Sequence, residues 1–146
     1  MTIGIPRNEA EQPAWRESMT EAINALPDHV NGRKTTTDDT STHALSLPIL
    51  PNIIYFMDWA VSARQTAGSA GTVGNGLVYH GESAWSLQSG TATEIGTGAT
   101  QLAVKDDSAW SVSLLPSGNT VYWTVTGDTD QTIGWRVDVN IRRIVG

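Results

Sequence analysis

The sequence predicts a mainly β protein, an antiparallel, jelly-roll-like β-sandwich preceded by an N-terminal arm and one short α-helix. Three observations predict this fold class. The 146 residues include 18 Thr, 12 Ser and 14 Gly, and only 16% are charged; Thr favours strands, whereas Gly and Ser favour turns. Several segments after residue 35 alternate apolar and polar residues, as half-buried strands do. One earlier segment repeats at the helical period of 3.6 residues instead.

Composition and charge exclude several classes of protein. The chain has no Cys, which excludes disulfides, thiolate metal sites and a cysteine nucleophile. Its formal net charge of −6 argues against a nucleic-acid partner, because duplex binding depends on cationic contacts with phosphate. No apolar run approaches the roughly 20 residues of a membrane span. Residues 1–6 show neither the basic flank nor the apolar stretch of a signal peptide, so we expect none.

We expect two parts, an arm-and-helix segment at residues 1–34 and a β-sandwich domain at residues 35–146. Nearly all of the net negative charge falls in the second part. Within the first, Pro13 suits the start of a helix, and Pro27 ends the pattern because the residue before a proline avoids the helical region. The apolar residues between them recur on one helical face: Trp15, Met19, Ala22, Ile23 and Leu26.

This apolar stripe predicts an attachment or oligomerisation surface. A helix of about fourteen residues is marginal on its own, so its stripe must rest on another surface. Trp15, Met19, Ile23 and Leu26 are therefore the candidate partner-binding anchor. The alternative is that the stripe packs on the sandwich of its own chain.

The second part contains five clear strand patterns, each with one apolar face. They lie at residues 53–63, 77–87, 110–114, 121–125 and 133–141, and shorter strands are expected at 42–47 and 100–104. Gly81 would allow a bend or bulge in the second strand. Five of the six Trp residues fall in these segments, and we assign most of them to the core. About seven short strands with one apolar face each suit two packed antiparallel sheets.

Several motifs in this part carry a resemblance. Residues 35–40 read TTTDDT and residues 105–114 read KDDSAWSVSL; SGN at 117–119, VTG at 125–127 and TIGWRV at 132–137 follow. Residues 35–146 thereby resemble a β-sandwich module of tailed-bacteriophage virion proteins, of the tail-fibre, head-fibre and capsid-decoration type. The matching residues are fold and turn residues and form no catalytic signature. Ser111 stands where the family often has Asp.

Candidate metal and catalytic residues are sparse. His29, His43 and His80 share no helical spacing and lie near no nucleophile motif, so we interpret them as surface histidines. The acid pairs Asp38-Asp39, Asp106-Asp107 and Asp128/Asp130 offer clustered oxygens, which hard cations prefer. They lack the alternating spacing of a dedicated calcium loop, and Asp is common in turns, so we interpret them as turn residues. We therefore expect no metal, no cofactor and no catalytic residues.

Four further features have a structural and a functional interpretation. Glu82 and Glu94 could form the facing carboxylates of a glycosidase, although solvent-facing strand positions explain them as well. The glycine-rich run at 67–76 lacks the Lys-Ser/Thr ending of a phosphate loop and reads as a hairpin tip. Tyr122 lies on the face opposite Val121, Trp123 and Val125, where it could stack on sugar rings. Arg142-Arg143 interrupts the last strand's alternation, and we expect these arginines to snorkel or to form ion pairs at an edge.

The resemblance and the anchor together imply a non-enzymatic virion structural protein. It would be a short fibre or decoration subunit, assembled in the host cytoplasm into the virion and held to capsid, neck or tail by its N-terminal segment. By analogy with fibre proteins we expect a homotrimer that binds other virion proteins, with no nucleic-acid and no membrane partner. The alternative is a module that binds a glycan or receptor for host attachment. A hydrolase acting on surface polysaccharide is a third hypothesis.

Overall fold

The computed structural model describes residues 26–146, and these residues form nine β-strands and no helix. The strands are β1 (His29–Thr36), β2 (Thr42–Pro48), β3 (Ile53–Gly68), β4 (Gly76–Gln88), β5 (Thr91–Glu94), β6 (Ala99–Lys105), β7 (Ser111–Ser117), β8 (Thr120–Thr126) and β9 (Gln131–Val145). Within this part of the chain, no helix is both long and apolar enough to cross a membrane. The predicted mainly β, antiparallel fold is confirmed, whereas the predicted helix falls largely outside the described residues.

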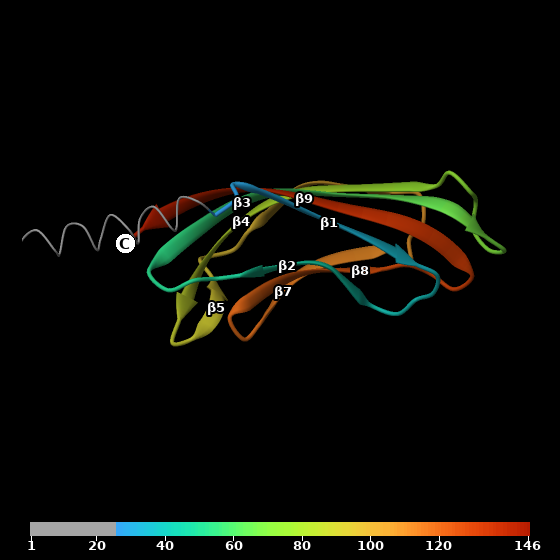
Figure 1. Cartoon of the computed structure of the whole chain (residues 1–146). Helices are drawn as coiled ribbons and strands as arrows, with labels where there is room; N and C mark the ends of the chain where they lie inside the picture. Colours follow the sequence, from blue (N-terminus) through green and yellow to red (C-terminus); the bar gives the residue numbers. More distant parts are fainter. Residues whose placement is uncertain (1–25) are drawn as a thin grey trace, which may run out of the picture.

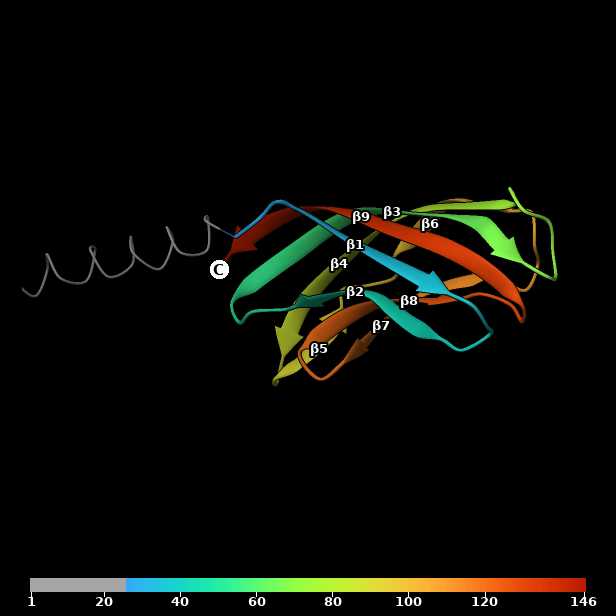
Figure 2. The same cartoon turned by 45° about the vertical axis from the view of Figure 1, so that its right-hand side comes forward.

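The strands form two antiparallel sheets that face each other as two layers (Figures 1 and 2). The larger sheet has the order β1-β9-β3-β4, and the far edge of β4 pairs with β5 at one end and with β6 at the other. The smaller sheet has the order β2-β8-β7. The larger sheet is wider than the smaller one, so every residue of β6 stays exposed.

The core lies between the layers because each strand turns its apolar residues to one side. Strand β3 alternates buried and more exposed positions along most of its length, and β8 and β9 do the same. All five Trp residues of the described part are buried, which confirms the expectation for most of them. They are Trp59, Trp85, Trp110, Trp123 and Trp135.

Hydrogen bonds to buried polar groups fix the positions of three of these indoles. The Trp85 Nε1–H donates to Ser83 Oγ at 2.9 Å. The Trp135 Nε1–H donates to Thr36 Oγ1 at 2.8 Å, which ties the end of β1 to the neighbouring β9. The Trp110 Nε1–H donates to Gln131 Oε1 at 2.8 Å. Because an unpaired buried donor is costly, these partners help to specify one arrangement of the core.

Two strands were not predicted. Strand β5 has only four residues, and β1 lies mostly within the segment that the sequence assigns to the arm. Strand β1 pairs with β9 along its whole length, from His29 opposite Asn140 to Thr36 opposite Ile133. The described sheet therefore begins before residue 35, and the predicted boundary between residues 34 and 35 falls inside β1.

Candidate functional site

The described chain enters the β-structure at the pole where it also ends. The Arg143 side chain, only 8% exposed, holds the residues that precede β1. Its guanidinium donates to Pro27 O at 2.6 Å, to Asp28 Oδ1 at 3.2 Å and to Leu26 O at 3.4 Å. The Ile141 amide also donates to Asp28 O at 2.7 Å. Residues 26–28 are thus fixed to the last strand, and β1 begins beside the end of β9 (Figure 1).

Arg143 holds this position because it occupies an inward-facing place at the end of β9. Its guanidinium lies 5.6 Å from the centre of the Tyr55 ring, so the cation also rests on an aromatic face. Arg142 points to the other face, where its guanidinium lies 5.8 Å from the Phe56 ring centre. The predicted ion pair is therefore observed for Arg143 with Asp28, at the chain's entry rather than at a sheet edge.

Of the four predicted anchor residues, the structure describes one. Leu26 is half-buried beside this pole, and its carbonyl accepts the hydrogen bond from Arg143. Trp15, Met19 and Ile23 lie outside the described residues. Their anchoring role stays a prediction.

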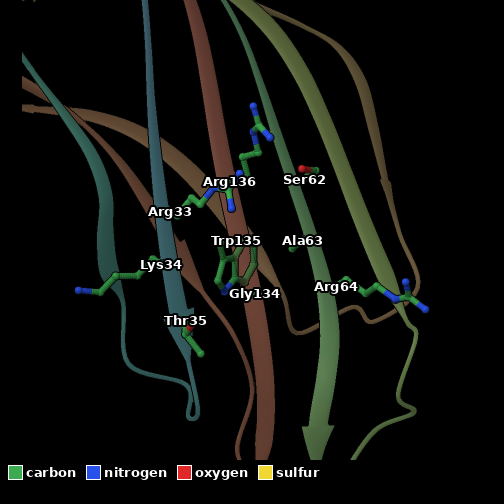
Figure 3. Close-up of a pocket in the computed structure, with 9 residues that line it drawn as sticks. All are labelled: Arg33, Lys34, Thr35, Ser62, Ala63, Arg64, Gly134, Trp135 and Arg136. Carbon is green, nitrogen blue, oxygen red and sulfur yellow. The ribbon is translucent and has the colours of Figure 1, made fainter.

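A groove of about 770 Å³ lies on the outer face of the larger sheet and is rich in cations (Figure 3). Arg33 of β1 lies directly opposite Arg136 of β9, and Ser62 of β3 is the next residue in that row. The next row holds Thr35, Gly134 and Arg64. Figure 3 shows Arg33 and Arg136 side by side, with Lys34 and Arg64 extending to opposite sides.

The electrostatics of this groove are unbalanced. Arg136 forms a two-bonded ion pair with Asp138, at 2.8 and 3.1 Å. Among the described residues, Arg33, Lys34 and Arg64 form no salt bridge within 4.0 Å. Within residues 26–146, this cluster is the main concentration of positive charge that lacks carboxylate partners. Such a groove suits an anionic ligand.

A second, aromatic surface lies on the outer face of the smaller sheet. Tyr122 faces away from the core, as predicted, and stacks on His43 with ring centres 4.2 Å apart. His43 Nδ1 lies 3.0 Å from Thr124 Oγ1, which fixes the imidazole. The two rings border a hollow of about 360 Å³ that Asn31 and Arg33 also line.

A third hollow, of about 300 Å³, opens between β4, β6 and β7. It brings together Glu82 and Glu94, the two carboxylates singled out in the sequence, beside Trp59 and Tyr79. Glu94 Oε1 accepts a hydrogen bond from the Gly98 amide at 2.5 Å, so this carboxylate closes the turn before β6. The indole nitrogen of Trp59 is buried without a hydrogen-bond partner among the described residues.

The aspartate pairs lie at or beside turns, and two of them meet at one amide. The Gln131 Nε2–H group donates to Asp107 Oδ2 at 2.9 Å and to Asp128 Oδ2 at 3.3 Å. The hydrogen bond from Gln131, a second one from the Ala109 amide and the charge of Lys105 hold the pKa of Asp107 below its ordinary value. Within residues 26–146, no three His, Asp or Glu side chains form a group that could hold a metal ion.

The three histidines lie in separate places and have separate partners. His29 Nδ1 lies 3.0 Å from Asn140 Oδ1, and His80 Nε2 lies 2.6 Å from Asp58 Oδ1. The glycine-rich run forms the connection between β3 and β4, where Gly68, Gly71 and Gly74 adopt positive φ angles. The predicted hairpin tip is therefore observed.

No local sequence pattern points to the cationic groove. Arg33 and Lys34 fall in the predicted arm, Arg64 ends a predicted strand and Arg136 lies within another. Only the register of β1, β9 and β3 brings Arg33, Arg136 and Arg64 to one face, whereas Lys34 lies opposite Trp135 at the edge of the groove. A search for outward-facing cations on neighbouring strands could find them once the strand pairing is known.

Comparison with solved structures links this fold to bacteriophage tailspikes. The tailspike protein of Acinetobacter baumannii phage AM24 matches with a TM-score of 0.52 and 6% identity, over 77% of this chain and 25% of that one. The tailspike of Acinetobacter phage vB_ApiP_P1 has a TM-score of 0.40 and 16% identity, over 77% of this chain and 22% of its own. The tailspike gp49 of Acinetobacter baumannii bacteriophage Fri1 is described as a capsular polysaccharide depolymerase. It has a TM-score of 0.40 and 13% identity, over 88% of this chain and 23% of its own.

These likenesses concern the fold alone. The chain spans about a quarter of the length of the solved tailspikes that it matches. No family model matches the sequence, and no curated protein does. The resemblance to a β-rich module of phage virion proteins, stated from the sequence, is confirmed at the level of the fold.

Proposed function

We propose that this chain is a non-enzymatic structural subunit of a bacteriophage particle. In this proposal, the residues that precede β1 attach it to capsid, neck or tail, and a jelly-roll-like β-sandwich projects outward as a short fibre or decoration module. The subunit would assemble in the host cytoplasm and stay in the virion. The fold that it shares with the AM24 tailspike supports the phage context.

The observation that carries the proposal is the fixed entry of the chain at one pole. Three hydrogen-bond acceptors of residues 26–28 bind the buried Arg143 side chain. An attached N-terminal segment can determine the orientation of the β-sandwich only if the residues that join the two are ordered. The Arg143 contacts supply that order, and the loop between β3 and β4 lies at the opposite pole (Figure 1).

Self-association into a homotrimer forms part of the proposal, and strand β6 supports it. All seven residues of β6 are exposed, and within residues 26–146 the strand pairs with β4 alone. Leu102 and Val104 of β6 and the facing Val78 of β4 are exposed apolar residues. An unpaired strand edge with apolar side chains is a ready site for pairing with another chain.

Light scattering of the full chain tests this arrangement. We expect a trimer at micromolar concentration and a loss of trimer in Val104→Lys, because charged residues block edge pairing. Leu115→Lys is the matched control, since Leu115 is similarly exposed on β7 of the other sheet. A monomer for the unaltered chain would contradict the homotrimer. Quantitative mass spectrometry of purified particles would test attachment, and a chain absent from them would contradict the virion role.

The non-enzymatic part of the proposal concerns Glu82 and Glu94. The hydrolase hypothesis needs one of them as general acid and the other as nucleophile or base. Glu94 instead accepts a turn-closing hydrogen bond from Gly98, which supports a structural role. Polysaccharide incubated with the full chain should keep its length. Depolymerisation that Glu82→Gln abolishes would contradict the proposal.

A second candidate function, glycan or receptor binding, is favoured by the stacked Tyr122 and His43 rings. Aromatic faces beside hydroxyl groups suit sugar rings, and Thr124 lies within hydrogen-bond distance of His43. A glycan array with the full chain and with Tyr122→Ala tests this candidate. Binding that persists unchanged in the variant would remove Tyr122 from the binding surface.

A further inference from the structure

We propose that the groove formed by β1, β9 and β3 binds a carboxylate-bearing polysaccharide. This inference goes beyond the structural role. It concerns the outer face of the larger sheet, whereas Tyr122 lies on the smaller sheet, although Arg33 borders both hollows. It depends on the charges of the groove, on its floor and on the chemistry of its lining. The ligand would present carboxylates to Arg33 and Arg136 and hydroxyl groups to the residues beside them.

Two arginines of the groove lie directly opposite each other. Arg33 and Arg136 are register partners on neighbouring antiparallel strands. Like charges directly opposite each other destabilise a sheet. Arg136 forms a partly exposed ion pair with Asp138, whereas Arg33 forms no salt bridge among the described residues. A bound carboxylate would compensate this charge, and a guanidinium binds a carboxylate through two parallel hydrogen bonds.

The floor of the groove, which is the β9 backbone around Gly134, is open. Gly134 lies between Thr35 and Arg64 in the row beside the two arginines. A Cβ atom at Gly134 would meet no atom within 4 Å, so packing does not require glycine there. Glycine in a strand interior weakens the strand and often marks a place where another molecule approaches the backbone. The missing side chain leaves room for a ligand above β9.

The exposed lining of the groove favours a polysaccharide over an acidic protein segment as the ligand. The apolar members of the lining, Ala63 and Trp135, are buried and belong to the core. The exposed lining therefore consists of cations and of the hydroxyls of Thr35 and Ser62. Protein partners bind mainly through buried apolar or aromatic anchors, for which this groove has no exposed counterpart. A chain of hydroxyls and carboxylates matches the lining.

Calorimetric titration of the full chain with a galacturonate hexamer tests the proposal. We expect saturable binding that weakens with added salt, because charge pairs at the surface are screened. Arg33→Gln should weaken binding about tenfold, which corresponds to about 1.4 kcal/mol. The same variant should unfold at an equal or higher temperature without ligand, since it removes the repulsion from Arg136. Gly134→Val should also weaken binding by filling the floor, while it remains folded.

Arg142→Gln is the matched control. It removes the same charge from an outward-facing residue of β9, about 20 Å along that strand from Arg136. Binding should be unchanged in this variant. The proposal would be overturned by equal weakening in Arg142→Gln and Arg33→Gln, by no binding of the hexamer, or by equal binding of neutral maltohexaose. Tighter binding of hexaglutamate would overturn the choice of a polysaccharide. The oligomer measured by light scattering is independent of all these outcomes.

Discussion

The side-chain amide of Gln131 donates a hydrogen bond to the carboxylate of Asp107 across 2.9 Å. This contact joins the turn before β7 to the first residue of β9. Gln131 is buried and also accepts the indole hydrogen bond of Trp110, so one side chain connects the core to a carboxylate at the surface.

The first prediction concerns acid stability. The Gln131 hydrogen bond, the Ala109 amide and Lys105 place the folded-state pKa of Asp107 below its ordinary value of 3.8. The stabilising contribution of Asp107 is therefore fully present above that value and is lost as the pH falls through the folded-state pKa. Urea unfolding from neutral pH down to about pH 2 should show Asp107→Asn less stable than the unaltered chain, with a difference that shrinks in acid. A difference that does not change with pH would contradict this account.

The second prediction concerns Gln131 itself. Gln131→Leu leaves the buried Trp110 N–H without its acceptor and Asp107 without its donor. We expect a loss of about 1–3 kcal/mol in the free energy of unfolding. A double-mutant cycle with Asp107→Asn should give a coupling of at least about 0.5 kcal/mol, because the two side chains are in contact. Additive effects would mean that the observed hydrogen bond contributes nothing.

The third prediction compares two glycines. A Cβ at Gly81 would overlap the Trp59 indole and lie 2.9 Å from Ala99 O, whereas one at Gly134 meets nothing within 4 Å. Gly81→Ala should therefore cost about 1–3 kcal/mol of stability through overpacking. Gly134→Ala should be neutral or stabilising by up to about 1 kcal/mol, because it restricts the unfolded chain. Thermal unfolding of both variants checks the contrast, and equal destabilisation would refute it.

The fourth prediction concerns the pole where the chain enters. Arg143→Met removes the donor to Leu26, Pro27 and Asp28. We expect faster amide hydrogen exchange at Ile141, whose N–H donates to Asp28 O, and a stability loss of about 1–3 kcal/mol. Arg142→Met is the control: its side chain is exposed, so the change should stay within about 0.5 kcal/mol. Unchanged exchange at Ile141 in Arg143→Met would show that Arg143 does not hold the entry.

The core was predictable because burial on one face imposes alternation. The segments that became β3, β8 and β9 carry apolar residues at every second position, and these residues form the interior of the structure. Strand β1 escaped prediction for the opposite reason. Its residues are mostly polar and exposed, and Gly32 lies in its middle. It is a strand because β9 offers it a complete hydrogen-bonding edge, which its own sequence does not reveal.

The candidate site was less predictable than the core. Tyr122 could be assigned to an outer face because its neighbours alternate so clearly. Its partner His43 lies on β2, which is far from β8 in the sequence although the two strands pair, and no local pattern connects the two residues. The same holds for Arg33 and Arg136, which meet only through the β1–β9 register. Surfaces built from several strands depend on how the strands pair, and strand pairing is determined by the whole fold rather than by local sequence.

The antiparallel pairing of β1 with β9 also determines how the molecule responds to tension. His29 begins β1 opposite Asn140, near the end of β9, so both flanking segments leave from the same pole. A pull that separates these two segments would unzip the β1–β9 ladder one bond at a time and would need little force. A pull between the arm and the opposite pole would load the same bonds together in shear. We therefore expect mechanical resistance to depend on direction and to be higher along the axis that joins the start of β1 to the opposite pole.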